Sequence, residues 1–320
     1  MNDENDTLWI QHKIQMFKNE MKKVLVGQDE LVEGLLVALI CGQHVLIEGV
    51  PGLAKTLTVK TLAKTLGLGF QRIQFTPDLL PSDLLGTQIF HPQKGDFAIK
   101  KGPIFTSILL ADEINRAPAK VQSALLEAME ERQVTLGEET FPLPRPFLVL
   151  ATQNPIEQEG TYSLPEAQLD RFMLKIHVDY PTRDQELNIL RQKKTQTQEP
   201  EQVFNLEDLD RLHSLATQVH VDPLLEEFIV DLVRSSRDSK PLGLDNYLRW
   251  GAGPRAVYFL LWAARAKALI EGRNFVLPED LKALAPGILR HRLLLSYEAL
   301  ADGKTPDDLV RALLAGVPAP

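Results

Sequence analysis

The stretch that most constrains the fold is EGVPGLAKT, residues 48–56, which directly follows the apolar run HVLI. An apolar run that ends in glycine and leads into Lys55 and Thr56 predicts a buried strand, a tight turn and the start of a helix. This arrangement is close to the phosphate-binding loop G-x-x-x-x-G-K-[ST], whose backbone N–H groups surround phosphate oxygens. One position departs from the pattern, because Ala54 stands where a glycine is usual.

The loop predicts a nucleotide site, since a phosphate group is favoured at the N-terminus of a helix. Lys55 is expected to neutralise the β- and γ-phosphates, and Thr56 to bind Mg²⁺. Alanine adds one methyl group and favours helix, so we expect the loop to remain functional. The alternative is a glycine-rich turn with a chance lysine. The predicted nucleotide-binding residues of the loop are Gly49, Val50, Pro51, Gly52, Leu53, Ala54, Lys55 and Thr56.

Two further apolar runs end in polar side chains that suit phosphoryl transfer. SILLADEINRA delivers Asp112 and Glu113, and FLVLATQNP delivers Asn154. Asp112 is predicted to hold Mg²⁺ through water, and Glu113 to orient the attacking water. Asn154 is placed to reach the γ-phosphate or that water. The alternatives are a solvated pair of acids and an Asn-Pro turn, but the order of the motifs favours the catalytic interpretation.

Two arginines are candidates for stabilising charge on the transferred phosphoryl group. Arg171 lies in LPEAQLDRF, and Arg255 lies at the predicted start of a helix in GAGPRAV. Phosphoryl transfer often uses an arginine that a neighbouring subunit supplies. The alternative for each residue is an ordinary surface ion pair.

The order of elements predicts an α/β fold. Strands are expected at HVLIEG, FQRIQF, SILLAD, FLVLATQ and FMLKIHV, with helices between them, including one from Pro118 to about Arg132. Such alternation favours a parallel sheet with helices on both faces. TQIFHPQKGDFAIKKGP, with a Lys94-Gly95 turn, and QVTLGEETFPL are expected to be inserted hairpins, either structural decoration or contact loops.

The second part of the chain has a different pattern of apolar and polar residues. The polar stretch RQKKTQTQEPEQVFN is predicted to be a linker, and no convincing strand follows Leu206. We therefore expect a nucleotide-binding core over residues 1–195 and a small helical domain over residues 196–320. We also expect the core to keep its fold without the second domain.

Charge and cysteine content limit the partners and the compartment. The net charge is −8 and no long basic run occurs, so nucleic acid is not an expected partner. The longest apolar run, which contains the single cysteine Cys41, is too short to span a membrane. We expect Cys41 to be a core residue, and we expect a cytoplasmic protein that does not insert into membranes.

Taken in order, the motifs VGQ, GVPGLAKT, ADEINRA, ATQNP, GTYSLPEAQLDRF, GAGPRA and LRHRLLLSYEA resemble the MoxR family of AAA+ ATPases. The resemblance extends from about Val26 to the C-terminus, and alanine before the lysine is usual in that family. It implies a five-stranded P-loop core with hairpin inserts, followed by a small all-helical lid. It also implies ATP and Mg²⁺ as cofactors and a homo-oligomeric ring, expected to be a hexamer.

The resemblance assigns further roles. Gly27 and Gln28 would lie near the adenine, and Arg171 would be an arginine finger that reaches the adjacent subunit. Arg255 would be the lid arginine called sensor 2, acting within its own subunit or across the interface. Arg116 could also touch a neighbour. Both hairpins would face the pore of the ring.

The implied function is chaperone-like remodelling, assembly or activation of protein complexes, with protein clients and a partner that carries a von Willebrand factor A domain. One alternative is the ATPase subunit of a metal chelatase, which shares the hairpin insert. A second is a nucleotide-gated scaffold that binds ATP without turnover, although Glu113 and Arg171 favour hydrolysis. A third is a DNA-translocating ring, which the acidic balance disfavours.

Overall fold

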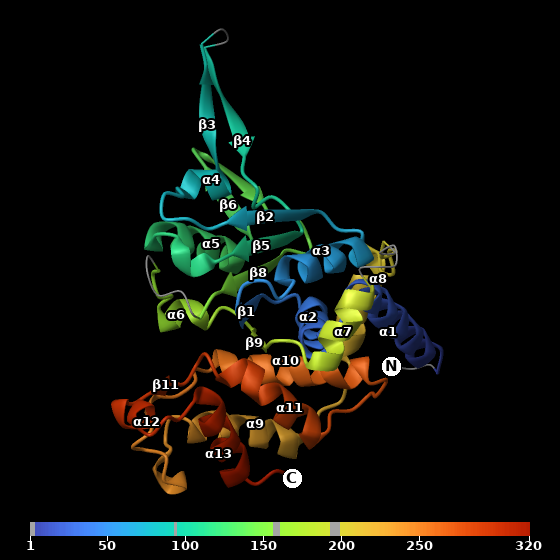
Figure 1. The fold of residues 1–320 in the computed structure, drawn as a ribbon, viewed down its shortest axis with the longest axis vertical. Coiled ribbons are helices and arrows are strands. Elements are labelled where there is room, and N and C mark those ends of the chain that lie inside the picture. The colour runs from blue at the N-terminus through green and yellow to red at the C-terminus, as the bar shows by residue number, and fades with distance from the viewer. Residues whose placement is uncertain (1–3, 93–94, 156–160, 193–198) are drawn as a thin grey trace.

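The structure is a computed structural model that describes residues 4–92, 95–155, 161–192 and 199–320. A parallel five-stranded sheet forms the centre of the molecule, in the order β2-β5-β8-β1-β9 (Figure 1). Its strands are β1 (Val45–Gly49), β2 (Phe70–Gln74), β5 (Ile108–Asp112), β8 (Leu148–Gln153) and β9 (Leu174–Val178). All five predicted strands are present, and the α/β prediction is confirmed.

The sheet is covered on both faces because its strands are apolar on both faces. In β5, Ile108 and Leu110 enter one hydrophobic cluster, whereas Leu109 and Ala111 enter another. Successive side chains of a strand point to opposite faces, so each cluster needs its own layer of helices. The first cluster takes in α1 (Glu4–Val24), α2 (Asp29–Cys41) and α3 (Lys55–Leu66); the second takes in α4 (Pro81–Leu85) and α5 (Ala119–Glu131).

Both predicted hairpins are present. One is formed by β3 (Gly86–His91) and β4 (Asp96–Lys101), and the other by β6 (Gln133–Leu136) and β7 (Glu139–Pro142). The β3–β4 hairpin projects from one end of the molecule (Figure 1). Gly95 has a φ of +67°, as a tight turn requires, while Lys94 lies outside the described residues. Shorter core elements are the 3₁₀ turn η1 (Ile114–Arg116), α6 (Glu166–Leu169) and α7 (Arg183–Gln192).

The second part of the chain is mainly helical. Its helices are α8 (Leu206–Thr217), α9 (Pro223–Ser235), η2 (Lys240–Leu242), α10 (Arg255–Ile270), α11 (Pro278–Leu289), α12 (Tyr297–Ala301) and α13 (Pro306–Gly316). One correction is needed, because β10 (Leu248–Trp250) and β11 (Leu294–Leu295) form a small antiparallel sheet. Strands this short show no detectable alternation in a sequence. Within the described residues, no helix combines the length and apolarity that crossing a membrane requires.

The predicted linker is only partly a linker. Its first residues end α7, and residues 193–198, which contain the expected boundary at 195, lie outside the described residues. Near its end the chain is packed into the core: the N–H of Val203 donates to the carbonyl of Thr65 at 2.8 Å. Phe204 is fully buried, and its ring centroid lies 5.8 Å from that of Phe17 in α1.

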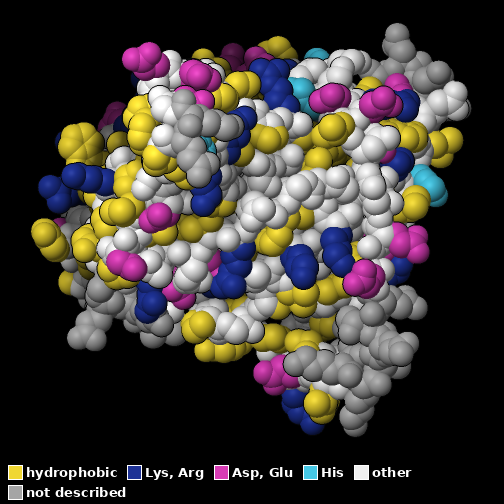
Figure 2. Space-filling model, turned by 90° about the horizontal axis from the view of Figure 1, so that it is seen from above, with side chains coloured by type: hydrophobic (Ala, Val, Ile, Leu, Met, Phe, Trp, Pro, Cys, Tyr) yellow, Lys and Arg dark blue, Asp and Glu magenta, His cyan; other side chains and the backbone are white. Residues whose placement is uncertain are grey.

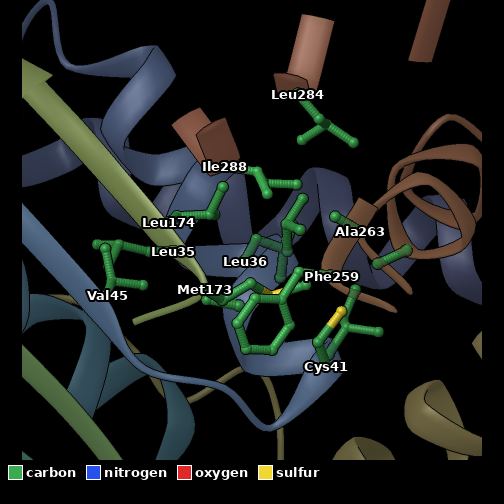
Figure 3. Packing of buried hydrophobic residues seen from close by; sticks show 14 of the residues in the cluster. Leu35, Leu36, Cys41, Val45, Met173, Leu174, Phe259, Ala263, Leu284 and Ile288 are labelled. Atoms are coloured by element: carbon green, nitrogen blue, oxygen red, sulfur yellow. The ribbon is translucent and has the colours of Figure 1, made fainter. Parts of the chain in front are cut away.

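One hydrophobic cluster joins the α/β core to the helices that follow it. Leu36 of α2, Leu174 of β9, Phe259 of α10 and Ile288 of α11 all belong to this cluster (Figure 3). Cys41 lies in the same cluster, and burial raises the pKa of its thiol. The prediction that Cys41 is a core residue is confirmed.

Candidate active site

The loop after β1 has a backbone that few sequences can adopt. A Cβ atom on Gly49 would lie 2.6 Å from the carbonyl oxygen of Val178, so β9 packs too closely for any other residue. Gly52 has a φ of +88° and Ala54 a φ of +57°. The left-handed conformation costs an L-residue roughly 1–2 kcal/mol. Ala54 therefore has a strained backbone at the N-cap of α3. The helix preference of alanine, on which our expectation relied, does not apply to this left-handed conformation.

Lys55 begins α3 and projects back over the loop. Its ammonium donates a hydrogen bond to the carbonyl of Gly49. Burial lowers its pKa, and the carboxylates of Asp112, Glu113 and Glu48 act in the opposite direction. The free N–H groups of the first helical turn and the helix dipole add positive potential at the same place. A half-buried cation at a helix N-terminus is an anion-binding arrangement.

The two predicted acids meet this loop at the carboxyl edge of the sheet. Asp112 ends β5; its Oδ1 accepts a hydrogen bond from the Thr152 hydroxyl at 2.6 Å. Its Oδ2 accepts from Arg72 Nη2 at 2.7 Å and Nε at 3.0 Å. Glu113 has a φ of +56°, and its N–H donates to the Thr152 oxygen at 2.9 Å. Thr152, on the strand between β5 and β1, therefore orients both acids.

Glu113 is also held by its side chain. Its Oε2 accepts a hydrogen bond from Gln74 Nε2 at 2.8 Å and lies 3.2 Å from Arg116 Nε. Arg116 thus pairs with an acid of its own chain. Sequence reasoning missed Arg72, Gln74 and Thr152. A signal existed for two of them, since the polar Arg72 and Gln74 stand on either side of the buried Ile73 in β2 and so share one face of the sheet.

Five of the predicted site residues, Lys55, Thr56, Asp112, Glu113 and Asn154, line one cavity of about 460 Å³. Asn154, which is buried directly after β8, also lies in the wall of this cavity. The described residues that line this cavity are Pro51, Gly52, Leu53, Ala54, Lys55, Thr56, Leu57, Arg72, Gln74, Asp112, Glu113, Thr152 and Asn154. The structure therefore brings together residues from three separate motifs, as the sequence predicted.

Gly27 and Gln28 line a neighbouring cavity of about 710 Å³ between α1, α2 and α7. Gln28 Nε2 donates to the carbonyl of Leu53 at 2.7 Å, and Gln28 Oε1 accepts from the Thr58 hydroxyl at 2.8 Å. Gln28 thereby links the start of α2 to the loop that precedes α3. Gly27 has a φ of +71°, and a Cβ there would meet the side chain of Gln185 of α7.

The structure places Arg171 and Arg255 elsewhere. Arg255 Nη2 lies 2.8 Å from Glu130 Oε1, and Arg171 Nε lies 3.6 Å from Glu130 Oε2. Both arginines line a third cavity of about 400 Å³, and none of the described residues lines both this cavity and the one at the phosphate loop. The two arginines are thus grouped with each other and apart from Lys55 of their own chain.

The donor set fits a nucleotide with Mg²⁺. Lys55 and the N-terminus of α3 supply the positive potential that phosphates need, and Thr56 and Asp112 bring oxygen atoms that could ligate Mg²⁺ into the same cavity. Mg²⁺ retains several water ligands in such sites. Because Asp112 already accepts from Arg72 and Thr152, contact with the metal through water suits this carboxylate.

Comparison with known proteins gives the class first. Residues 44–174 match the ATPase family associated with various cellular activities (AAA), and residues 244–313 match the AAA lid domain. A crystal structure of a candidate ATPase from Cytophaga hutchinsonii superposes with a TM-score of 0.92 at 48% identity, covering 99% of this chain and 98% of that chain. The fold and the site are therefore those of an AAA+ ATPase.

Relatives then give the family. The chain is 47% identical over 312 residues to chaperone MoxR1 of Mycobacterium tuberculosis, covering 97% of this chain and 83% of that protein. It is 32% identical over 329 residues to protein MoxR of Methylorubrum extorquens, covering 95% and 94% of the two chains. The chain belongs to the MoxR family of AAA+ ATPases.

Proposed function

We propose that this ATPase hydrolyses ATP with Mg²⁺ at boundaries between subunits of a homo-oligomeric ring, expected to be a hexamer. It would use the free energy to remodel, assemble or activate protein complexes in the cytoplasm. One observation carries the proposal: Lys55, Asp112 and Glu113 line one cavity, while Arg171 and Arg255 line another. Two half-sites on separate surfaces of one chain are what a head-to-tail assembly of identical subunits requires.

Within one subunit, we assign each residue a role from its contacts. Lys55 and the first N–H groups of α3 would hold the phosphates, and Thr56 and Asp112 would hold Mg²⁺, which neutralises charge on the phosphate oxygens. Glu113 would orient the attacking water with Oε1, since Gln74 and Arg116 both contact Oε2. Asn154 would contact that water or the γ-phosphate, and Gly27 and Gln28 would lie beside the base.

At the boundary, Arg171 would reach the phosphates bound to the adjacent subunit. Arg255 lies beside it, paired with Glu130 at 2.8 Å and with Asp170 at 3.8 Å. This grouping supports a role for Arg255 across the interface in preference to one at its own loop. Arg116, which pairs with Glu113, is more simply explained as a partner of that acid.

The β3–β4 hairpin supports a protein client. Phe90 and Phe97 are 51% and 65% exposed near its free end, and their ring centroids are 5.2 Å apart. Figure 2 views the molecule from this end, where hydrophobic side chains lie among charged ones of both signs. We propose that this hairpin and the β6–β7 hairpin contact protein clients. The ATPase would act on these clients with a partner protein that carries a von Willebrand factor A domain.

A mixing experiment tests hydrolysis at boundaries. Arg171→Ala keeps a complete cavity at Lys55 but has no finger to offer, whereas Glu113→Gln has an impaired cavity and a sound finger. Each variant alone should be nearly inactive, since an arginine finger contributes about 10³–10⁵ in rate. In a 1:1 mixture with random exchange around a closed ring, about a quarter of the boundaries combine a good cavity with a good finger.

ATPase rate is measured against mixing ratio, and exchange is verified with a tag on one variant. We expect activity to rise well above that of either variant and to be highest near equal proportions. Verified exchange without a rise in rate would show that Arg171 does not act across a boundary. Full activity of Arg171→Ala alone would exclude it as a finger altogether.

A further inference from the structure

Arg292 is a buried arginine of the lid that contacts the segment carrying Arg171. Its side chain is 1% exposed. Its Nε donates to Asp170 Oδ1 at 2.7 Å, and its Nη2 donates to the carbonyl of Asp170 at 2.8 Å and to that of Phe172 at 2.7 Å. Arg292 Nη1 donates to the carbonyl of Met173 at 3.3 Å. The guanidinium therefore binds the main chain on both sides of Arg171.

These contacts account for a charge that would otherwise be costly to bury. An unpaired buried cation is strongly destabilising, and a planar guanidinium can satisfy several acceptors at once. Here the acceptors are a carboxylate and backbone carbonyls, and the ring of Phe259 lies 5.0 Å from the guanidinium. Burial lowers the pKa of Arg292 to about 10, so it remains charged at neutral pH.

The same segment connects to the other arginines. Asp170 pairs with Arg292 at 2.7 Å and with Arg255 at 3.8 Å, and Glu130 pairs with both Arg255 and Arg171. Arg171 has the looser contact, with 3.6 Å to Glu130, against 2.8 Å for Arg255. The ion pair of Arg171 with Glu130 is thus the longer of the two, while the backbone on both sides of Arg171 is anchored to the lid.

We propose that Arg292 is a positioning residue for Arg171: it fixes residues 170–173 from the lid, so that Arg171 meets the nucleotide site of the next subunit at the right place. This inference rests on the proposed role of Arg171 across a subunit boundary. Displacement of a reacting group by about 1 Å can cost on the order of 10² in rate. Loss of the Arg292 contacts should therefore impair the finger and leave the cavity at Lys55 intact.

The test is Arg292→Lys in the full chain. Lysine keeps the charge but lacks the planar fork that binds several carbonyls. The matched control is Arg290→Lys in the same lid segment. Arg290 donates to Asp307 Oδ1 at 2.9 Å and to the carbonyl of Lys175 at 3.2 Å. It therefore also links the lid to the core, through hydrogen bonds to residues other than 170–173.

We expect Arg292→Lys to lose activity by roughly 10- to 100-fold, with ATP binding unchanged within about twofold. Mixing separates a finger defect from a defect in the cavity. Arg292→Lys mixed with Glu113→Gln should regain activity, whereas Arg292→Lys mixed with Arg171→Ala should not. Arg290→Lys alone should keep nearly normal turnover.

Three results would overturn the inference. They are normal activity of Arg292→Lys, recovery with Arg171→Ala in place of Glu113→Gln, and no recovery with either partner. Arg171→Ala mixed with Glu113→Gln is run in parallel: if that pair also fails to recover, the boundary mechanism itself is wrong.

A second variant is used if Arg292→Lys does not fold, which its unfolding midpoint and its ATP binding would show. Asp170→Asn removes the negative charge that pairs with Arg292, and it changes the half-buried residue of the pair instead of the buried one. It should show a smaller loss of rate with the same mixing pattern. Normal turnover of Asp170→Asn would then overturn the inference.

Discussion

At the scale of single residues, two residues of the candidate active site have unusual backbone conformations. Ala54 and Glu113 both have positive φ values, of 57° and 56°. Such strain is found where surrounding structure fixes the backbone, often at functional sites. For Glu113 the fixing contact is the 2.9 Å hydrogen bond from its N–H to Thr152. The backbone of Glu113 is thus held by Thr152, and its carboxylate is oriented by Gln74 and Arg116.

Lys55 and Glu113 should have separable effects. Lys55→Ala removes the main countercharge for phosphates, so we expect the loss of ATP binding as well as turnover. Glu113→Gln keeps a similar shape but cannot accept a proton, so ATP and Mg²⁺ should still bind while turnover is lost. The measurements are nucleotide affinity and steady-state ATPase rate. Equal loss of affinity in both variants would contradict the role assigned to Glu113.

His44 should make stability depend on pH. Its Nδ1 accepts a hydrogen bond from the N–H of Val149 at 2.9 Å, which only the neutral ring can do. Burial and the charge of Arg132 lower its pKa to about 3. Above its ordinary pKa of about 6.5 the stabilising contribution of the neutral ring is fully present. As the pH falls from about 6.5 towards 3, the unfolded chain binds a proton that the folded chain does not, so stability is lost.

His44→Asn is the comparison for this effect, because an asparagine oxygen can replace the acceptor without titrating. Denaturant unfolding midpoints should fall less for the variant than for the natural protein between pH 7.5 and 5.5, where few carboxylates titrate. The slope attributable to one histidine is at most about 1.4 kcal/mol per pH unit. Parallel curves for the two proteins would show that His44 contributes nothing.

At the scale of elements, the β3–β4 hairpin is the one most readily separated from the core. Glycines at its base allow close packing: a Cβ on Gly86 would lie 2.3 Å from the carbonyl of Lys100, and one on Gly102 would lie 2.3 Å from the carbonyl of Leu84. Beyond this base its residues are mostly exposed. An exposed hairpin adds little buried apolar area, and hence little stability.

Shortening this hairpin should spare the fold and the basal ATPase activity but reduce coupling to a client. Residues 90–97 are replaced by Asn-Gly between the paired residues Ile89 and Ala98, which suits a two-residue turn. Thermal stability, ATPase rate and client maturation are measured. A second variant keeps the full hairpin length but changes both Phe90 and Phe97 to serine. It distinguishes the effect of the aromatic side chains from the effect of the length of the hairpin. A large fall in the unfolding temperature would instead indicate a structural role.

At the scale of the whole molecule, the lid and the core share one hydrophobic cluster. Leu35 and Leu36 of α2 are fully buried, in a cluster with Phe259 of α10 and Ile288 of α11 (Figure 3). The polar stretch over residues 191–205 indicated two independent domains. The packing changes that expectation, since removal of the lid would expose this apolar surface to water.

A chain that ends at Gln192 should therefore be unstable or aggregate, in contrast to our expectation from sequence. A chain with a protease site inserted among residues 193–198 provides the matched comparison. After cleavage its two fragments should stay together on gel filtration, because the apolar contact does not depend on the connection. Isolation of a soluble, cooperatively unfolding core fragment would contradict this prediction and restore the two-domain interpretation.

The sequence by itself determined the sheet, its strands and the residues at its carboxyl edge. Each strand is a short apolar run, and the candidate site residues lie at or shortly after the ends of the strands that finish at Gly49, Asp112 and Gln153. Such patterns can be recognised in the sequence because the start of a helix and the apolar run of a buried strand each involve residues that are close together in the chain. Parallel strands bring their carboxyl ends to one edge, so Lys55 and Asp112 were expected at the same edge, and they line one cavity there.

Only the tertiary structure decided how the acids are held and where the arginines lie. Arg72 reaches Asp112 across two paired strands, and Arg292 reaches Asp170 over 122 positions of the chain. An isolated arginine carries no sign of its partner, because the partner is set by packing between elements that are distant in sequence. The short β10–β11 pair and the burial of Phe204 were unpredictable for the same reason: each depends on a distant surface to pack against.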